Sequence, residues 1–423
     1  MLDIKFIREN QELIKAAAKK KHIEFDVKEL LEVDDRRREL LATVEAKRAE
    51  QGAANAKIVT AKTDEERKTL IEEMRALKQN TAEDEEMLKD VTKEWQMLMV
   101  AVPNIPDVSV PEGESDLDNK EIRAWGERPN FNFDIKSHID IMRDLKMVDL
   151  ERGAKVAGFR GYILMNEGVL LAQALSNFVL QQFAGKSFEI MIVPSLVKKA
   201  NLIGTGYLPQ GEEDLYKTQD GDFLAGTAEV ATMGYFMDEI IEKKSLPRKI
   251  LSLSPCFRRE AGSHGKDTKG LVRVHEFHKL EQVVICEANH EETVKFHEEL
   301  IKNAEEVMWV LELPYRVVIN CGADLGLGQV KKYDIEAWVP SENTYRETHS
   351  ASYFHDFQTR RLGVRYKDDE GKLKFAHSLN STAIPIPRIL VPLVEINQRE
   401  DGSVAIPKAL QQFMGGRTEI RRV

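Results

Sequence analysis

The sequence predicts an α+β protein in which an antiparallel-sheet domain follows a long antiparallel hairpin of two helices. Between residues 27 and 98 there is no proline and only one glycine, Gly52, and the composition is that of long helices. Beyond residue 108, strand-like runs alternate with helical ones, and several neighbouring strands are joined only by short loops. Short loops favour antiparallel pairing, because parallel strands need a long crossover. We therefore expect a helical domain over residues 1–108 and an α+β domain over residues 109–423.

The helical hairpin is predicted from a heptad pattern, in which residues recur at alternating steps of three and four. One run comprises Leu30, Val33, Arg37, Leu40, Val44, Lys47, Gln51, Ala54 and Ile58, and the other Leu70, Met74, Leu77, Thr81, Asp84, Leu88, Val91, Trp95 and Leu98. Between the runs, Thr63-Asp64-Glu65-Glu66 predicts a capping box that starts the second helix. Two arms of this length would extend roughly 50 Å.

The second domain begins after a linker that contains Pro103, Pro106 and Pro111, since each proline favours extended backbone in the residue before it. Strands are predicted over 189–193, 249–253, 282–286, 315–319 and 334–339. Helices are predicted over 169–183, 228–243, 290–311 and 389–398. No Gly-rich phosphate loop and no internal repeat interrupt this pattern.

The composition, with 42% hydrophobic and 31% charged residues among 423, is that of an ordinary globular protein. No run of about 18 uncharged apolar residues is present, so no membrane-spanning helix is predicted. The first residues lack the apolar run of a signal peptide, and we expect a cytoplasmic protein. The three cysteines, Cys256, Cys286 and Cys321, form no CxxC pair and no even-numbered framework, so we expect reduced, structural thiols.

Charge is distributed unevenly along the chain. The net charge is −10, whereas residues 47–78 contain eight basic and six acidic residues, a local balance of +2. The basic residues are Lys47, Arg48, Lys57, Lys62, Arg67, Lys68, Arg75 and Lys78. Two interpretations stay open at this point: a solvated helix surface, or a basic projection that binds a polyanion.

The most informative stretch predicts a strand, a long loop and a returning strand. It reads PCFRREAG over residues 255–262 and GLVRVHEFHKLE over residues 270–281. This stretch resembles motif 2 of the class II aminoacyl-tRNA synthetases, and within them the bacterial-type seryl-tRNA synthetases. Further resemblances follow in the family's order: GTGYLP (204–209) after Pro194 (motif 1), GTAE (226–229), RETHS (346–350), and Asn380 through Arg388 (motif 3). The hairpin resembles the family's tRNA-binding arm, so the likeness covers essentially the whole chain.

The resemblance implies ATP-dependent activation of L-serine to seryl-adenylate, followed by transfer to tRNA(Ser), with tRNA(Sec) as a further acceptor. It also implies a homodimer through motif 1 and a requirement for Mg²⁺. Such a reaction brings a carboxylate to a triphosphate, so fixed cations and bidentate donors are needed. Guanidinium groups suit this task because they donate two parallel hydrogen bonds.

Individual roles are carried over by resemblance. Arg258, Glu347 and Arg388 would be catalytic, and Glu347 and Ser350 would hold Mg²⁺ with oxygen ligands. ATP would be bound by Arg258, Arg259, Glu260, Arg273, Val274, Phe277, Glu347, Thr348, His349, Ser350 and Arg388. Serine would be bound by Thr227, Ala228, Glu229, Glu281, Asn380 and Thr382, whose carboxylates suit an ammonium and whose hydroxyl and amide groups suit a hydroxymethyl group. The basic residues between 47 and 78 would contact tRNA.

Two features depart from this assignment. His264, His275 and His278 suggest zinc, but their spacing matches no common site, and we expect none. In motif 3, Pro385 and Pro387 replace small residues of many relatives, and we expect them to delay the following helix until Arg388.

Two other function classes remain as alternatives. One is a related amino-acid ligase that loads a carrier protein, and the other is an RNA-binding paralogue with an inactive site. The intact hairpin disfavours the first alternative. The presence of Arg258, Glu260, Glu281, Glu347 and Arg388 disfavours the second.

Overall fold

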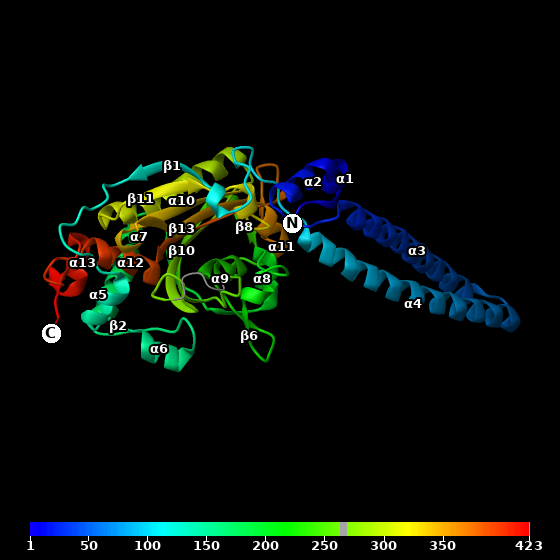
Figure 1. Cartoon of the computed structure of the whole chain (residues 1–423). Helices are drawn as coiled ribbons and strands as arrows, with labels where there is room; N and C mark the ends of the chain where they lie inside the picture. Colours follow the sequence, from blue (N-terminus) through cyan, green and yellow to red (C-terminus); the bar gives the residue numbers. More distant parts are fainter. Residues whose placement is uncertain (263–268, 423) are drawn as a thin grey trace. The chain divides into compact units, whose positions relative to one another are not determined.

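The structure, a computed structural model, describes residues 1–262 and 269–422. The chain forms two compact units (Figure 1). One unit, the arm unit, contains Leu2–Lys19 and Ile23–Pro103. The other, the catalytic unit, contains Met1, Lys20–His22 and the chain from Asn104 onward. The chain therefore leaves the catalytic unit after His22 and returns to it at Asn104.

The arm unit consists of two short helices and the predicted hairpin. Its elements are α1 (Ile4–Glu9), α2 (Gln11–Lys20), α3 (Val27–Thr60) and α4 (Asp64–Ala101). The side chain of Thr63 caps α4 by accepting a hydrogen bond from the N–H of Glu66. The capping box is wrong in one detail, because the Glu66 carboxylate accepts from the N–H of Lys62 rather than from that of Thr63. The helix therefore starts where the sequence predicts.

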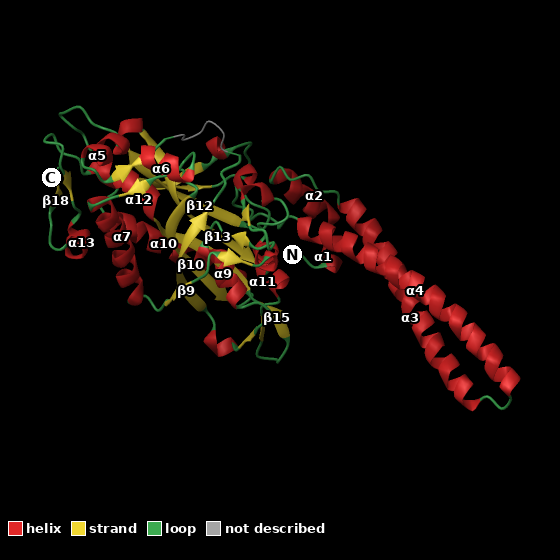
Figure 2. Ribbon diagram, turned by 90° about the horizontal axis from the view of Figure 1, so that it is seen from below, coloured by secondary structure: helices red, strands yellow, loops and turns green. Residues whose placement is uncertain are grey.

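The predicted heptad seam is confirmed, because α3 and α4 lie side by side and their seam positions are the least exposed (Figure 2). Leu30, Val33, Val44 and Met74 are buried. Polar seam residues contact one another in the hairpin: Lys47 with Asp84 (2.6 Å), Gln51 with Thr81 (2.6 Å), and Arg37 over the ring of Trp95 (4.4 Å). Each polar side chain therefore has a partner on the facing helix.

The catalytic unit is built on a sheet that has eight strands within the described residues. Their order is β1 (Lys120–Trp125), β11 (Tyr315–Ile319), β12 (Lys331–Val339), β13 (Thr344–His355), β16 (His377–Pro385), β10 (Glu276–Cys286), β9 (Arg248–Phe257) and β4 (Glu189–Ile192). All neighbours pair antiparallel except β4, which runs parallel to β9 at the edge. The predicted α+β class with a largely antiparallel sheet is confirmed.

Shorter elements surround this sheet. The helices are α5 (His138–Asp144), α6 (Leu150–Ala157), α7 (Glu167–Ala184), α8 (Lys199–Thr205), α9 (Ala228–Tyr235), α10 (His290–Val310), α11 (Phe357–Leu362), α12 (Ile386–Ile396) and α13 (Lys408–Gln411). The short strands are β2 (Val148–Asp149), β3 (Ile163–Leu164), β5 (Leu196–Val197), β6 (Tyr216–Lys217), β7 (Phe223–Leu224), β8 (Ile240–Ile241), β14 (Arg365–Lys367), β15 (Leu373–Phe375), β17 (Val404–Ala405) and β18 (Glu419–Ile420).

Successive side chains of β10 point to opposite faces of the sheet, and the candidate site lies on one of these faces. Leu280 and Val284 belong to the main core, which also contains residues of α7, α10 and α12. Val283 and Ile285 belong to a second core with residues of α9 and α11, on the opposite face. Lys279 and Glu281 lie on this second face, where they line a cavity together with residues of α8 and α9.

Two sequence-based boundaries are wrong. The helix predicted over residues 228–243 ends at Tyr235, because Asp238 adopts a positive φ of 61° and Ile240–Ile241 forms β8 with β14. The helix after motif 3 begins at Ile386 and not at Arg388. Pro387 lies in the first turn, where no intrahelical donor is needed, so proline is tolerated there.

Two further expectations concern the cysteines and membrane-spanning helices. The three cysteines are free and buried. No helix within the described residues combines the length and the apolar character that crossing a membrane requires.

The seam contact between Lys47 and Asp84 generates a stability prediction. Asp84→Ala should increase amide hydrogen exchange in the middle of α3 and α4, because it leaves the half-buried Lys47 ammonium without its carboxylate, at a cost of about 1 kcal/mol. The double variant Lys47→Leu/Asp84→Leu should restore or exceed parental protection, since apolar packing replaces the pair. Arg48→Ala is the matched control, because the Arg48–Glu85 pair is exposed and should contribute little. Equal exchange in Asp84→Ala and Arg48→Ala would contradict the prediction.

Candidate active site

The first of two adjoining cavities, here called the acidic cavity, measures about 350 Å³. Its polar lining comes from the start of α9, from β10 and from β16, and includes Thr227, Glu229, Glu281 and Asn380. Gly326, Leu327, Gly328 and Gln329, from the loop before β12, form another part of the wall. The cavity therefore brings together four of the six predicted serine-binding residues.

Glu229 is almost fully buried in this cavity and is held from two sides. Its carboxylate accepts a hydrogen bond from Gln358 (2.6 Å) and another from the hydroxyl of Tyr207 (3.0 Å). Burial, together with the nearby negative charge of Glu281, nevertheless raises the pKa of Glu229. The negative charge of Glu229 is thus disfavoured in the free protein, and a cation in the cavity would stabilise it.

Lys279 joins the acidic residues and is the main site residue that the sequence-based assignment missed. Its ammonium donates to the hydroxyl of Thr227 (2.9 Å) and lies 2.6 Å from the carboxylate of Glu281. The hydroxyl of Thr382 donates to the same carboxylate at 3.3 Å. In the sequence, a lysine two residues before a predicted site glutamate on one strand was the available signal, because residues i and i+2 share a face.

The second cavity, here called the cationic cavity, measures only about 40 Å³. Its lining includes Arg258, Glu260, Arg273, Val274, Phe277, Glu347, Thr348, Ser350, Thr382 and Arg388. The cavity is small because oppositely charged side chains occupy it: Arg388 lies 3.1 Å from Glu347, and Arg273 lies 3.1 Å from Glu260. Most of the predicted ATP-binding residues are therefore together, in an arrangement that balances their own charges.

A β-bulge places Glu347 and Ser350 on the same wall. In a regular strand, residues three apart point to opposite faces. In the pairing of β12 with β13, Ile335 lies opposite His349 and Glu336 opposite Glu347, which leaves Thr348 as the extra residue. Glu347 and Ser350 consequently both line the cationic cavity. The positive charges of Arg388 and Lys332 lower the pKa of Glu347 to about 2, so its carboxylate is ionised at neutral pH.

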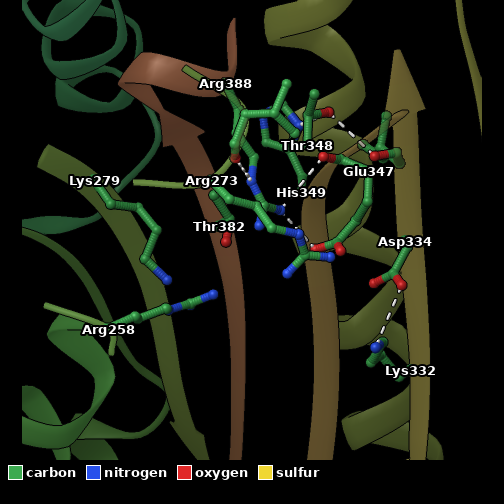
Figure 3. Close-up of polar contacts among 12 residues, drawn as sticks. Arg258, Arg273, Lys279, Lys332, Asp334, Glu347, Thr348, His349, Thr382 and Arg388 are labelled. Atoms are coloured by element: carbon green, nitrogen blue, oxygen red, sulfur yellow. Dashed lines mark hydrogen bonds and ion pairs between the residues drawn. The ribbon is translucent and has the colours of Figure 1, made fainter. Parts of the chain in front are cut away.

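The two cavities share a wall made of Arg258, Lys279 and Ser350, which line both. In Figure 3 the Arg258 and Lys279 side chains extend toward the same space. The guanidinium of Arg258 is oriented by a hydrogen bond to the carbonyl oxygen of Gly226 (3.3 Å), and it lies 5.4 Å from the centre of the Phe277 ring. The two cations, Arg258 and Lys279, therefore lie where ligands bound in the two cavities would meet.

Lys332 and Asp334, on β12, extend the charged network beside Glu347 (Figure 3). They form an ion pair (3.3 Å), and Asp334 lies opposite Ser350 in the sheet. Burial raises the pKa of Asp334 despite the nearby Lys332 ammonium. The sequence-based assignment missed this pair because it reads as part of an ordinary strand.

Three predicted residues lie outside both cavity linings. Arg259 is exposed and does not line either cavity. The side chain of His349 is fully buried among protein atoms, and burial lowers its pKa to about 3. Ala228 is buried as the first residue of α9. Any contact of Ala228 with a substrate would therefore involve its backbone.

The histidines of the zinc hypothesis are placed only in part. His275 hydrogen-bonds through Nδ1 to the carbonyl oxygen of Arg258 (2.8 Å). His275 and His278 line a separate cavity of about 600 Å³ between α6, α7 and the sheet. His264 lies outside the described residues.

The cations of the arm fall into two groups. Lys47 and Arg48 form ion pairs with Asp84 and Glu85 within the hairpin. The other six, Lys57, Lys62, Arg67, Lys68, Arg75 and Lys78, are exposed, and among the described residues none of them forms an ion pair. We call these six residues the free arm cations.

Glu229 generates a prediction in which stability and binding change in opposite directions. Glu229→Gln should raise the melting temperature by a few degrees at pH 8, because it removes a carboxylate whose ionised form is disfavoured in the folded protein. A carboxyl group whose pKa is higher in the folded than in the unfolded state lowers the free energy of unfolding at pH values above its unfolded-state pKa, and has no such effect below it. The gain from Glu229→Gln should therefore vanish as the pH falls toward about 4.5. Thermal unfolding from pH 8 to pH 4.5 measures this gain, and a melting temperature below that of the parental protein at pH 8 would refute it. Serine-dependent activity should fall in the same variant.

Comparisons with known proteins agree over the whole chain. The family profile "Seryl-tRNA synthetase N-terminal domain" matches residues 1–106, and "tRNA synthetase class II core domain (G, H, P, S and T)" matches residues 216–397. A serine–tRNA ligase of Deinococcus radiodurans is 43% identical over 418 residues, covering 99% of this chain and 98% of that protein. One from Rubrobacter xylanophilus is 40% identical over 417 residues, 98% of each chain.

Solved structures show the same likeness. The seryl-tRNA synthetase of Pyrococcus horikoshii, crystallised with ATP, superposes with a TM-score of 0.89 at 38% identity, covering 100% of both chains. The cytoplasmic serine–tRNA ligase of Naegleria fowleri, in complex with AMP, gives a TM-score of 0.85 at 31% identity, covering 100% of this chain and 99% of that one. The family predicted from the motifs is confirmed, and the chain belongs to the seryl-tRNA synthetases of class II.

Proposed function

We propose that this chain is an ATP-dependent serine–tRNA ligase, which activates L-serine as seryl-adenylate and transfers the seryl group to tRNA(Ser). The observation that carries the proposal is the wall of Arg258, Lys279 and Ser350 between an acidic and a cationic cavity. An amino acid in the acidic cavity and a nucleotide in the cationic one would meet at this wall. The family's relatives at about 40% identity carry the same activity in their names.

The acidic cavity suits a small hydroxylated amino acid. Glu229 and Glu281 offer carboxylates to its ammonium group, and Thr227 adds a hydroxyl beside them. Glu281 and Thr382, which already share a hydrogen bond, offer partners to a hydroxymethyl group. An amino acid that lacks the hydroxyl would leave these buried groups unpaired, which disfavours alanine. The substrate carboxylate would face the cations of the shared wall.

The cationic cavity suits a nucleoside triphosphate. We assign Arg258 to the carboxylate and the α-phosphate and Arg388 to the terminal phosphates. Phe277 would stack on adenine, while Glu260 and the backbone of Val274 would bind its edge. ATP cannot enter about 40 Å³, so the Arg388–Glu347 and Arg273–Glu260 pairs must open. Incoming phosphates would replace these carboxylates as partners of the arginines.

Activation follows from this arrangement. A carboxylate oxygen of serine attacks the α-phosphorus of ATP, and pyrophosphate leaves with the pair of electrons of the broken P–O bond. Negative charge builds up on the phosphate oxygens, where the Arg258 and Lys279 cations can stabilise it. In the second step a terminal ribose hydroxyl of tRNA attacks the acyl carbon, the bond from this carbon to the phosphate oxygen breaks, and AMP leaves while the hydroxyl proton is released to solvent.

Glu347 and Ser350 fit a magnesium ion. Both offer oxygen atoms to the same space, and the Glu347 carboxylate is ionised at neutral pH. Mg²⁺ bound there would neutralise phosphate charge during activation. The arginines that line the same cavity, Arg258 and Arg388, would orient the phosphates.

Transfer RNA is assigned to the arm. The six free arm cations would bind phosphates along the hairpin, whereas Lys47 and Arg48 already have carboxylate partners. We further propose that the protein is a cytoplasmic homodimer and that tRNA(Sec) is a second acceptor. The homodimer rests on the resemblance of motif 1 to that of the family, and the second acceptor rests on the resemblance of the chain as a whole.

Serine-dependent exchange between ATP and pyrophosphate tests the activation step directly. Purified protein with Mg²⁺, ATP and serine should exchange label, whereas Arg258→Ala and Arg388→Ala should each lose at least about 100-fold, because each removes a preorganised cation. Arg259→Ala is the matched control, since its exposed side chain lies outside both cavities. No exchange by the parental protein would leave the paralogue with an inactive site as the better hypothesis. Exchange without charging of tRNA would favour the carrier-protein ligase.

The arm generates a separate prediction for the second step. Replacing the six free arm cations with glutamine should leave serine-dependent exchange within about twofold and abolish efficient charging, because lost phosphate contacts weaken tRNA binding strongly. The salt dependence of tRNA binding should also become less steep, with a slope smaller by up to about six. Lys89→Gln/Lys93→Gln is the control, since both lysines pair with acidic residues on their own helix. Parental charging efficiency in the six-fold variant would show that the free cations do not bind tRNA.

A further inference from the structure

We propose that Lys21 and Asn104 are positioning residues for the acidic cavity, because together they bind every backbone carbonyl of residues 326–329. These four residues form one wall of the cavity. The inference rests on the proposed function, since it assigns Lys21 and Asn104 to the serine side of that site. Neither residue lines the cavity itself.

Lys21 supplies three of the contacts. It is only 3% exposed, and its ammonium donates to the carbonyl oxygens of Gly326 (3.1 Å), Leu327 (3.0 Å) and Gln329 (2.6 Å). An ammonium has three donors, so its hydrogen-bonding capacity is used entirely on this loop. Within the described residues no carboxylate pairs with Lys21, and the loop's carbonyl dipoles are therefore its direct partners.

Asn104 supplies the remaining hydrogen bonds to the carbonyls of residues 326–329. Its backbone N–H donates to the carbonyl oxygen of Leu327 (2.9 Å), and its side-chain amide donates to that of Gly328 (2.9 Å). The same amide group donates to the carbonyl oxygen of Phe354 (2.8 Å), another residue of the cavity wall. Asn104 is 4% exposed, so these bonds are shielded from water.

Apart from the N–H of Gln329, which donates to the carbonyl oxygen of Gly326 (3.2 Å), Lys21 and Asn104 are the donors to the carbonyls of this loop among the described residues. A buried carbonyl without a donor costs free energy, so losing the donors would favour another loop conformation. Packing also leaves little room around Gly328, since a Cβ on this residue would lie 2.5 Å from a ring carbon of Phe357. The carbonyl bonds and this close packing together hold residues 326–329 against the cavity.

The two anchors also mark where the arm unit joins the catalytic unit. Lys21 lies in the Lys20–His22 segment, after which the chain departs into α3 and α4, and Asn104 is the residue at which it returns. Both attachment points of the hairpin are therefore bonded to the same cavity wall.

The test measures exchange kinetics in variants that remove the donors. Lys21→Met keeps a long side chain and should raise the KM for serine about tenfold or more, while the KM for ATP stays within about twofold. Asn104→Ala, which retains the backbone bond, should act in the same direction with a smaller effect. Lys20→Met is the matched control, because the Lys20 ammonium donates to the carbonyl oxygen of Val110 and not to the loop.

Hydrogen exchange of the amides of residues 325–330 provides a readout that does not need activity. These amides should exchange faster in Lys21→Met and Asn104→Ala than in the parental protein or in Lys20→Met. Parental exchange together with a parental KM for serine would overturn the inference, as would equal increases of the KM for serine and for ATP. If the parental protein itself shows no serine-dependent activity, the proposed function fails, and the amide exchange alone decides whether the two residues hold the loop.

Discussion

The buried contact between the Lys279 ammonium and the Glu281 carboxylate is the interaction on which the site depends. Glu229 and Glu281 occupy one cavity, and burial together with the nearby negative charge of Glu281 disfavours the ionised form of Glu229. Lys279 offsets one of these charges and leaves one carboxylate for an incoming ammonium. Together with Arg258 it also supplies the positive wall toward which a substrate carboxylate would turn. A zwitterionic amino acid therefore matches the charges that the chain itself provides.

Irregularities in two strands give this site its shape. The extra residue Thr348 in β13 brings Glu347 and Ser350 to one wall, and the extra residue Ala383 in β16 sets Thr382 opposite Glu281. Both bulges lie in the middle of the sheet, where neighbouring strands hold them in place. Without these bulges, one residue of the Glu347–Ser350 pair and one of the Thr382–Glu281 pair would face the core. The chemistry of the cationic cavity thus depends on pairing register as much as on residue type.

In the arm, too, some charged side chains have partners among the described residues and others do not. Along the hairpin the polar seam residues find partners on the facing helix, so they specify how α3 and α4 align. The six free arm cations remain available to an anion. The arm unit and the catalytic unit are connected at Lys20–His22 and Asn104, where the chain is bonded to the wall of the acidic cavity. Asn104, which lies in the stretch predicted as a linker, consequently belongs to the catalytic unit.

The sequence by itself determined the hairpin, the antiparallel sheet and the residue types of the site. Heptad spacing and strand alternation are local patterns, and the motifs around Arg258, Glu281 and Arg388 stand in one order along the chain. Only the tertiary structure decided which of those residues share a cavity. The burial of His349 and the contacts of Lys279 follow from strand register and bulges, which depend on pairing with distant strands. Arg259 lies beyond the end of β9, in a loop where its side chain is exposed. Likewise, no local pattern near Lys21 indicates that its ammonium binds a loop some three hundred residues away.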